Sequence, residues 1–271
     1  MQQGARGIEG FGLVSVPPPL DVHAHVSAEI TRNDLAELGA FIFAMTRTLD
    51  EFDSVRLRQD RRTVWGVGVH PGLVKAHKQF DAQRFSEALD HSPVVGEIGL
   101  DSSSRVPMSI QLRTFRSALR ELQLKPRVVS IHSSGAQIHV LRELLRTPID
   151  GVILHWWTGS VELTEEAVRL GCYFSFPPAS MSSTELLSSI PLSRLLAETD
   201  HPFGDRYGPK ERKPGNVREV EERLGELANR RRFDMRGIFW RNFCSLVEEA
   251  GVAAMFNEVW LTEIQKTSLR P

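Results

Sequence analysis

Eight short runs of apolar and β-branched residues recur along the chain, and each ends in polar residues, glycine or proline. Such runs are typical of buried strands, and the segments between them show the apolar period of helices that cover a sheet. A strand followed by a helix, repeated eight times, closes most naturally into a barrel. The sequence therefore predicts an α/β fold, the (β/α)8 TIM barrel. The predicted strands are 19–25, 40–46, 63–69, 93–98, 127–132, 151–156, 171–176 and 195–199.

The clearest helical period lies in QLRTFRSALRELQL, between the fourth and fifth predicted strands. Its apolar residues form one stripe that would face a sheet: Leu112, Phe115, Leu119 and Leu122. Its arginines lie on the opposite side: Arg113, Arg116 and Arg120. Further helices are predicted over 135–146, 161–170 and 216–231.

The length of the chain suits one barrel domain. A chain of 271 residues is within the usual size of this fold, and we expect residues 19–271 to form it. Residues 1–18 are rich in glycine and proline, which predicts a loosely ordered N-terminal arm. Cys172 and Cys244 lie singly in apolar stretches, so we expect buried, reduced thiols rather than a disulfide framework.

The charge balance predicts no overall attraction to nucleic acid, and the hydropathy predicts no membrane span. The 33 Lys and Arg residues are balanced by 34 Asp and Glu residues, so the formal net charge is −1 and no overall positive field would attract nucleic acid. No run approaches the roughly 20 apolar residues of a membrane span. The first residues also lack a cationic segment followed by an apolar one. We therefore predict a cytoplasmic protein without membrane association.

Side chains capable of chemistry stand at the ends of the predicted strands. Barrel enzymes build their active sites there, from strand C-termini and the loops that follow. His23 and His25 are two residues apart on one strand, which directs both imidazoles to the same side. The full set comprises His23, His25, His70, Glu97, Asp101, His132, His155 and Asp200.

Six of these side chains predict a metal centre. A single histidine is more often structural than a ligand, but this many buried imidazoles and carboxylates are costly unless paired or bound to metal. Six ligands exceed the needs of one tetrahedral ion, so we expect two divalent ions about 3.5–4 Å apart that share Glu97 and activate a hydroxide. The donors suit Zn2+, Mn2+, Mg2+ or a similar ion. The predicted ligands are His23, His25, Glu97, His132, His155 and Asp200.

Other residues are assigned around this centre. Asp200 is predicted to accept the proton of the attacking water as well as to bind metal, and His70 and Asp101 to contact substrate. Trp156 and Trp157 follow His155 and are predicted to stack on a base or sugar, with ordinary core packing as the alternative. We expect three histidines in polar or amphipathic stretches to be solvated: His77, His91 and His139. His201 either lines the mouth or is a loop residue without a ligand role.

These residues stand within motifs that resemble the TatD-type deoxyribonucleases of the metal-dependent amidohydrolase superfamily. The motifs are DVHAHV, GVHP, VGEIGLD, IHSSGA, LHWWTGS and ETDHPF, with GNV and RNF after them, and the resemblance covers about residues 20–250. It implies an amidohydrolase-like barrel and the same six metal ligands. It also places an Arg two residues after the fifth-strand histidine, where this chain has Ser134, so that phosphate recognition would pass to another group such as Arg105 or Arg206.

The leading functional prediction is hydrolysis of DNA phosphodiester bonds at exposed or single-stranded ends. The near-neutral charge argues against a long cationic track for duplex DNA. A second hypothesis keeps the ions but changes the bond to an ester or amide, because an activated hydroxide attacks carbonyl carbon and phosphorus alike. A third is a metal-bound component that recognises nucleic acid or protein partners in a defence assembly, since HWWTGS and ETDHPF resemble TatD-like proteins of anti-phage cassettes.

Overall fold

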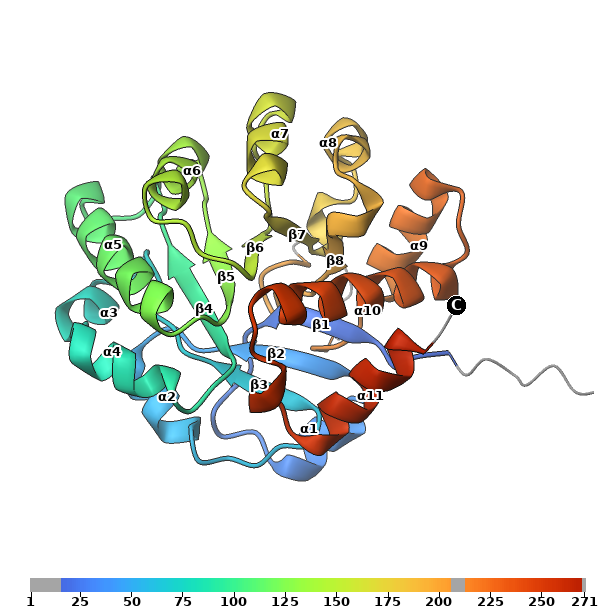
Figure 1. Ribbon diagram of the computed structural model, residues 1–271, viewed down its shortest axis with the longest axis horizontal. Coiled ribbons are helices and arrows are strands. Elements are labelled where there is room, and N and C mark those ends of the chain that lie inside the picture. Colours follow the sequence, from blue (N-terminus) through green and yellow to red (C-terminus); the bar gives the residue numbers. More distant parts are fainter. Residues whose placement is uncertain (1–15, 206–212, 270–271) are drawn as a thin grey trace, which may run out of the picture.

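The computed structural model describes residues 16–205 and 213–269. Within them eight parallel strands form a ring surrounded by helices, as Figure 1 shows. The strands are β1 (Leu20–Ala24), β2 (Phe41–Met45), β3 (Thr63–Gly66), β4 (Val94–Gly99), β5 (Val128–His132), β6 (Val152–His155), β7 (Tyr173–Phe176) and β8 (Leu195–Ala197).

Two parallel sheets join to make the barrel. One has the order β1-β2-β3 and the other β4-β5-β6-β7-β8. Val67 forms a parallel bridge with Val95, which connects the β3 side to β4. On the other side the backbone of Asp200 donates to the carbonyl of His23 at 2.9 Å. These contacts close the ring and confirm the predicted (β/α)8 barrel.

Helices follow the strands, and all but the last two cover the outside of the barrel. They are α1 (Arg32–Glu37), α2 (Leu49–Val55), α3 (Val74–Gln79), α4 (Ala82–Leu89), α5 (Met108–Leu124), α6 (Gln137–Arg146), α7 (Val161–Arg169), α8 (Thr184–Ser189), α9 (Arg218–Ala228), α10 (Arg232–Glu249) and α11 (Glu258–Ser268). The predicted helices over 135–146 and 161–170 correspond to α6 and α7. The helix predicted over 216–231 is shorter, because Asn229 adopts a left-handed conformation (φ 50°) that ends α9.

Three predicted strands extend two or more residues beyond one end of the observed strand. β3 ends at Gly66; its continuation forms the Val67 bridge, and the Val69 amide donates to the Glu97 carbonyl at 3.0 Å. β7 begins at Tyr173 because Gly171 lies in the turn that ends α7, with φ 82°. β8 stops at Ala197, and the amide of Thr199 donates to the Asp21 carboxylate at 2.9 Å instead of to a neighbouring strand.

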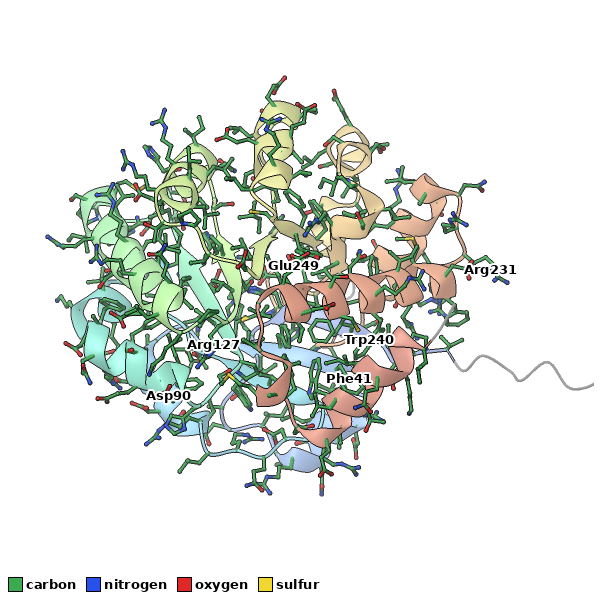
Figure 2. The ribbon with its side chains drawn as sticks, viewed as in Figure 1. Phe41, Asp90, Arg127, Arg231, Trp240 and Glu249 are labelled. Carbon is green, nitrogen blue, oxygen red and sulfur yellow. The ribbon has the colours of Figure 1, made fainter. Side chains whose placement is uncertain are left out.

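The apolar core has two parts, one outside and one inside the barrel. The inner part joins the lower barrel to α10 and α11, which cross the N-terminal ends of the strands (Figure 1). Figure 2 labels Phe41 and Trp240 in this region; their ring centroids lie 5.0 Å apart, and Trp260 lies 4.7 Å from Phe41. The sequence reasoning assigned no role to these two helices. They close the lower end of the barrel, and the C-terminal ends of the strands lie at the opposite end.

The structure covers little of the predicted N-terminal arm, because residues 1–15 lie outside the described residues. The last part of the arm is bound to α10: Trp240 Nε1 donates to the Pro18 carbonyl at 2.8 Å, and Arg236 donates to that of Pro17 at 3.4 Å. Among the described residues neither Cys172 nor Cys244 forms a disulfide. Cys172 is buried, but Cys244 is only half-buried, with its Sγ 3.9 Å from the Ile264 carbonyl of α11. No helix in residues 16–205 or 213–269 has the length and apolar character of a transmembrane span.

Candidate metal centre and active site

A cavity of about 450 Å3 opens at the C-terminal ends of the strands. All but two of the predicted site residues line it, the exceptions being His23, which lies beneath, and Trp157. The lining residues are His25, His70, Glu97, Asp101, His132, Ser133, Ser134, His155, Trp156, Thr158, Asp200 and Phe203.

The predicted His23 and His25 pair meets at the end of β1, with ring centroids 5.2 Å apart. The register of β1 against β2 shifts between Asp21 and Ala24, so a bulge lies where the strand turns from apolar to polar contacts. His25 Nδ1 donates to the Met45 carbonyl at 3.3 Å, which leaves Nε2 facing the site. His23 Nδ1 pairs with the Ser130 hydroxyl at 2.7 Å, which likewise leaves Nε2. Both imidazoles therefore present the same ring nitrogen.

Glu97 lies at the centre of the site and is almost fully buried. Its Oε1 lies 3.1 Å from His25 Nε2, and its Oε2 lies 2.8 Å from His132 Nδ1 and 2.9 Å from His155 Nε2. Burial opposes the charged carboxylate, but the surrounding histidines outweigh it and hold the pKa of Glu97 well below its usual range. The preceding glycine permits this close packing, because a Cβ at Gly96 would lie 2.4 Å from Met45 Sδ.

A buried nitrogen without a hydrogen-bond partner indicates that the site suits a cation. His23 Nε2 is such a nitrogen among the described residues, and it faces the Asp200 carboxylate. Burial, with the charge of His155, lowers the pKa of His23 well below its ordinary value, so its imidazole is neutral and able to bind metal. Three overlapping groups have ligand atoms within 4.8 Å of one another: His23, His155 and Asp200; His23, His25 and Glu97; and His70, Glu97 and His132. The donor set fits divalent metal.

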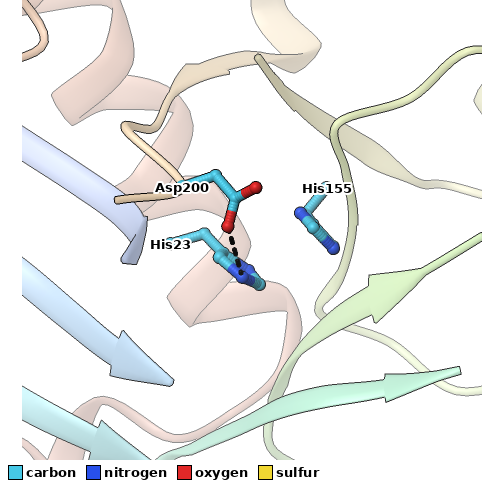
Figure 3. Close-up of side chains that lie close together, drawn as sticks. All are labelled: His23, His155 and Asp200. Carbon is cyan, nitrogen blue, oxygen red and sulfur yellow. Dashed lines mark ion pairs between the residues drawn. The ribbon is translucent and has the colours of Figure 1, made fainter. Parts of the chain in front are cut away.

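Asp200 follows β8 and faces both histidines of β1. Its Oδ1 lies 3.7 Å from His23 Nε2, the contact drawn in Figure 3, and 3.6 Å from His25 Nε2. The His155 ring stacks on that of His23 with centroids 3.8 Å apart. Burial is the main cause that raises the pKa of Asp200 to about 7. Its φ of 42° is left-handed, a strain that is concentrated at functional sites.

His70 also faces Glu97, with Nε2 3.2 Å from Oε1. Its Nδ1 accepts a hydrogen bond from the Gly72 amide at 2.9 Å, so the neutral ring carries its proton on Nε2. Burial lowers the pKa of His70, which favours this neutral form. A protonated Nε2 is a donor and cannot bind metal. The geometry thus supports the predicted division between His70 and the six ligands.

The family model described as "TatD related DNase" matches residues 20–248 of the chain. The chain belongs to the TatD-related DNase family. Its relatives include the uncharacterized metal-dependent hydrolase YabD of Bacillus subtilis, 28% identical over 237 residues that cover 76% of this chain and 90% of that protein. The human deoxyribonuclease TATDN3 is 28% identical over 250 residues, which cover 80% of this chain and 88% of that protein. Membership confirms the predicted class, metal-dependent hydrolase.

A solved structure from the same family confirms the fold. The TatD homologue YJJV from Escherichia coli superposes with a TM-score of 0.75 at 22% sequence identity. The superposition covers 84% of this chain and 96% of that one. The amidohydrolase-like barrel expected from the motifs is therefore present.

A layer of polar residues beneath the predicted ligands was not predicted from the sequence, although one of them, Glu198, begins the ETDHPF motif. Glu198 is fully buried; its Oε1 accepts from the Trp156 amide at 3.0 Å and lies 3.7 Å from His155 Nδ1. Its Oε2 accepts a short hydrogen bond from the Ser175 hydroxyl. Glu198 and Ser130 each stand two residues before a predicted ligand on a strand, the spacing that identified His23 and His25. This two-residue spacing is the sequence signal from which Glu198 and Ser130 could have been identified.

Trp156 and Trp157 lie in different environments. Trp156 is half-buried and lines the cavity, with a left-handed φ of 40°. Trp157 is fully buried in the core, where its Nε1 donates to Thr164 at 2.8 Å and its ring packs on Phe174. The predicted stacking role of Trp157 is therefore wrong, because the turn at Trp156 sends the two indoles in different directions. The unpredicted Phe203 lines the mouth instead, 5.5 Å from His25 between ring centroids.

The remaining predictions have mixed outcomes. His91 and His139 are exposed as expected, but His77 is half-buried and bonds to Thr114 at 2.9 Å and to the Pro71 carbonyl at 3.0 Å. The solvated role of His77 is corrected, because α3 packs against α5 there. Asp101 lines the cavity as predicted, and its Oδ2 lies 3.7 Å from His132 Nε2. Arg206 lies outside the described residues.

Proposed function

We propose that the protein is a DNase that hydrolyses phosphodiester bonds at exposed or single-stranded DNA ends, with two divalent ions in the cavity. The observation that carries the proposal is the position of Glu97. One carboxylate oxygen faces His25, while the other faces His132 and His155. A carboxylate whose two oxygens face different imidazoles is suited to bridge two ions.

The ligand set proposed for the ions is the one predicted from the motifs: His23, His25, Glu97, His132, His155 and Asp200. When bound, divalent ions supply Lewis-acid activation of water and neutralise charge on phosphate oxygens. Imidazole and carboxylate donors without thiolate suit Zn2+ or Mn2+. Six donors exceed the needs of one tetrahedral ion, which supports two.

The other side chains bind substrate and move protons. Asp200 accepts the proton of the attacking water at Oδ1, the oxygen that faces the histidines of β1. His70 donates from Nε2 to a substrate oxygen, because Gly72 fixes its tautomer. Asp101 orients His132 from the far side of the ring. Trp156 offers an aromatic surface for a base at the rim.

The dimensions of the cavity support a strand end as substrate. Its volume of about 450 Å3 is near the lower end of the roughly 300–1,000 Å3 typical of ligand pockets. This space suits one nucleotide better than a stacked base pair. No Lys or Arg of the described residues lines the cavity, so bound ions and imidazoles provide its positive charge.

The proposal is tested with metal-stripped protein reloaded with Mn2+ or Zn2+. End-labelled single-stranded and blunt duplex DNA are assayed beside a p-nitrophenyl ester. We expect about two ions per chain, metal-dependent shortening of the single strand, slower cleavage of the duplex, and no cleavage by Glu97→Ala. Ester hydrolysis without DNA cleavage at saturating metal would refute the DNase assignment, and one ion or none per chain would refute the binuclear centre.

A further inference from the structure

The positive charge of this nearly neutral chain is concentrated in one stretch. Between Arg105 and Arg146 stand eight Lys or Arg residues and two Glu residues, a formal charge of +6, whereas the whole chain has −1. The rest of the molecule is therefore net acidic. The stretch contains α5 and α6, which lie side by side on the outside of the barrel in Figure 1.

Four arginines of these helices are exposed: Arg113 and Arg120 on α5, and Arg142 and Arg146 on α6. Arg146 pairs with Glu143, whereas no carboxylate of the residues that the structure describes forms an ion pair with Arg113, Arg120 or Arg142. Arg113 and Arg120 lie on the same side of α5, seven residues or about 10 Å apart along the axis. We name Arg113, Arg120 and Arg142 the basic face.

An ion pair joins the two helices. Arg116 Nε and Nη2 each donate at 2.7 Å to the buried carboxylate of Glu143 on α6. Glu143 also accepts from Arg146 at 3.0 Å. The one acidic side chain of α6 is thus engaged between the helices, where it does not offset the charge of the basic face.

The two helices that carry the basic face begin beside the mouth of the cavity. Gln111, in the first turns of α5, accepts from the amide of the cavity-lining Asp101 at 2.8 Å. Gln137, the first residue of α6, donates to the cavity-lining Thr158 at 2.8 Å. Both helices start at the rim and run toward the lower end of the barrel. A polymer whose end occupies the cavity can therefore extend along the outer surface of α5 and α6.

We propose that the basic face binds the phosphate backbone of a single-stranded nucleic acid whose end lies in the cavity. This inference rests on the proposed function. Arginine guanidinium groups bind phosphate oxygens in bidentate fashion, and three such contacts would steepen the salt dependence of binding. For single strands the slope of log K against log salt changes by about 0.7 per contact, so the basic face accounts for a slope of about 2.

The test compares two triple variants with equal charge changes. Arg113→Ala/Arg120→Ala/Arg142→Ala removes the basic face. The control, Arg32→Ala/Arg61→Ala/Arg241→Ala, removes three exposed arginines remote from the cavity lining. Binding of a fluorescent 20-nucleotide oligothymidylate is measured by anisotropy in EDTA from about 50 to 200 mM salt. Thermal melts check both folds, and cleavage of the 20-mer and of a dinucleotide is measured with Mn2+.

We expect the basic-face variant to bind the 20-mer on the order of tenfold more weakly at 50 mM salt, with the slope reduced by about 2. Dinucleotide turnover should be unchanged, and the control should bind within about twofold of wild type. Equal losses in both variants, or no loss in either, would overturn the proposal. If DNA is bound through the basic face but never cleaved, the inference stands and the proposed DNase activity fails. If the basic-face variant binds and cleaves DNA as wild type does, the inference fails and the proposed DNase activity stands.

Discussion

Replacement of Glu198 by Gln should weaken metal binding without disrupting the barrel. Glu198 is fully buried beneath the ligands, where it accepts from the Trp156 amide and the Ser175 hydroxyl. Gln has nearly the same volume and can retain both contacts, because its oxygen accepts from the amide and the Ser175 hydroxyl can reverse its donor role. What the substitution removes is the negative charge near His155.

The separation sets the expected magnitude. Glu198 Oε1 lies 3.7 Å from His155 Nδ1, which is longer than a hydrogen bond, so the carboxylate acts on the imidazole mainly through charge. Carboxylates that hydrogen-bond directly to a ligating histidine contribute about 10–100-fold to metal affinity. We therefore expect the lower end of this range, about a tenfold higher dissociation constant, which is about 1.4 kcal/mol.

Competition with a chromophoric chelator measures the affinity for Zn2+ and Co2+, and Co2+ absorption reports the geometry of the site. Ser175→Ala is the matched control, since it removes a partner of Glu198 but leaves the charge. Its affinity should change by less than about threefold, well below the effect of losing the carboxylate charge beside a ligating histidine. If Glu198→Gln binds metal as tightly as wild type while circular dichroism shows an intact fold, the positioning role of Glu198 is refuted.

Three further outcomes are expected. Asp200→Asn should keep most of its metal at saturating concentration while hydrolysis falls about 10²–10⁴-fold, the contribution of a general base; near wild-type turnover would contradict the proton transfer. His70→Ala should retain metal but raise KM, whereas loss of metal as complete as in Glu97→Ala would make His70 a ligand. Glu143→Gln should lower the free energy of unfolding by about 1 kcal/mol at pH 7. Because Arg116 lowers the pKa of Glu143, this difference is fully present above the ordinary carboxyl pKa, declines as the pH falls below it, and should vanish in unfolding curves only below the lowered pKa of the folded protein.

The barrel and the positions of the site residues were predictable because both follow from strand periodicity. Parallel strands bring their C-termini to one end, so residues as distant as His23 and Asp200 were expected to meet there. The hydrogen bond from the Asp200 amide to the His23 carbonyl, at 2.9 Å, shows how directly the ends adjoin. The conformations of the loops do not enter into this expectation.

The directions of side chains after a strand were not predictable, because they depend on single backbone angles. Trp156 and Trp157 are neighbours of the same residue type, but the left-handed turn at Trp156 places its indole at the cavity and that of Trp157 in the core. The sequence pattern also does not predict that Trp240 and Trp260 pack against the lower end of the barrel. Their helices follow the last strand, and a helical period does not say which surface a helix covers.

The residues beneath the ligands follow from the same two-residue period and decide which nitrogens are available. Along β5, and along β8 and the residues that follow it, the inward-facing positions change from Val128 and Leu196 in the inner core to Ser130 and Glu198, and then to the proposed ligands at the mouth. Ser130 engages His23 Nδ1 and so leaves Nε2 for the site. From the N-terminal to the C-terminal end of the barrel, the interior therefore changes from apolar residues to polar residues that orient the imidazoles, and then to the proposed ligands. A polar residue two positions before a ligand is therefore a candidate positioning residue in any strand of such a barrel.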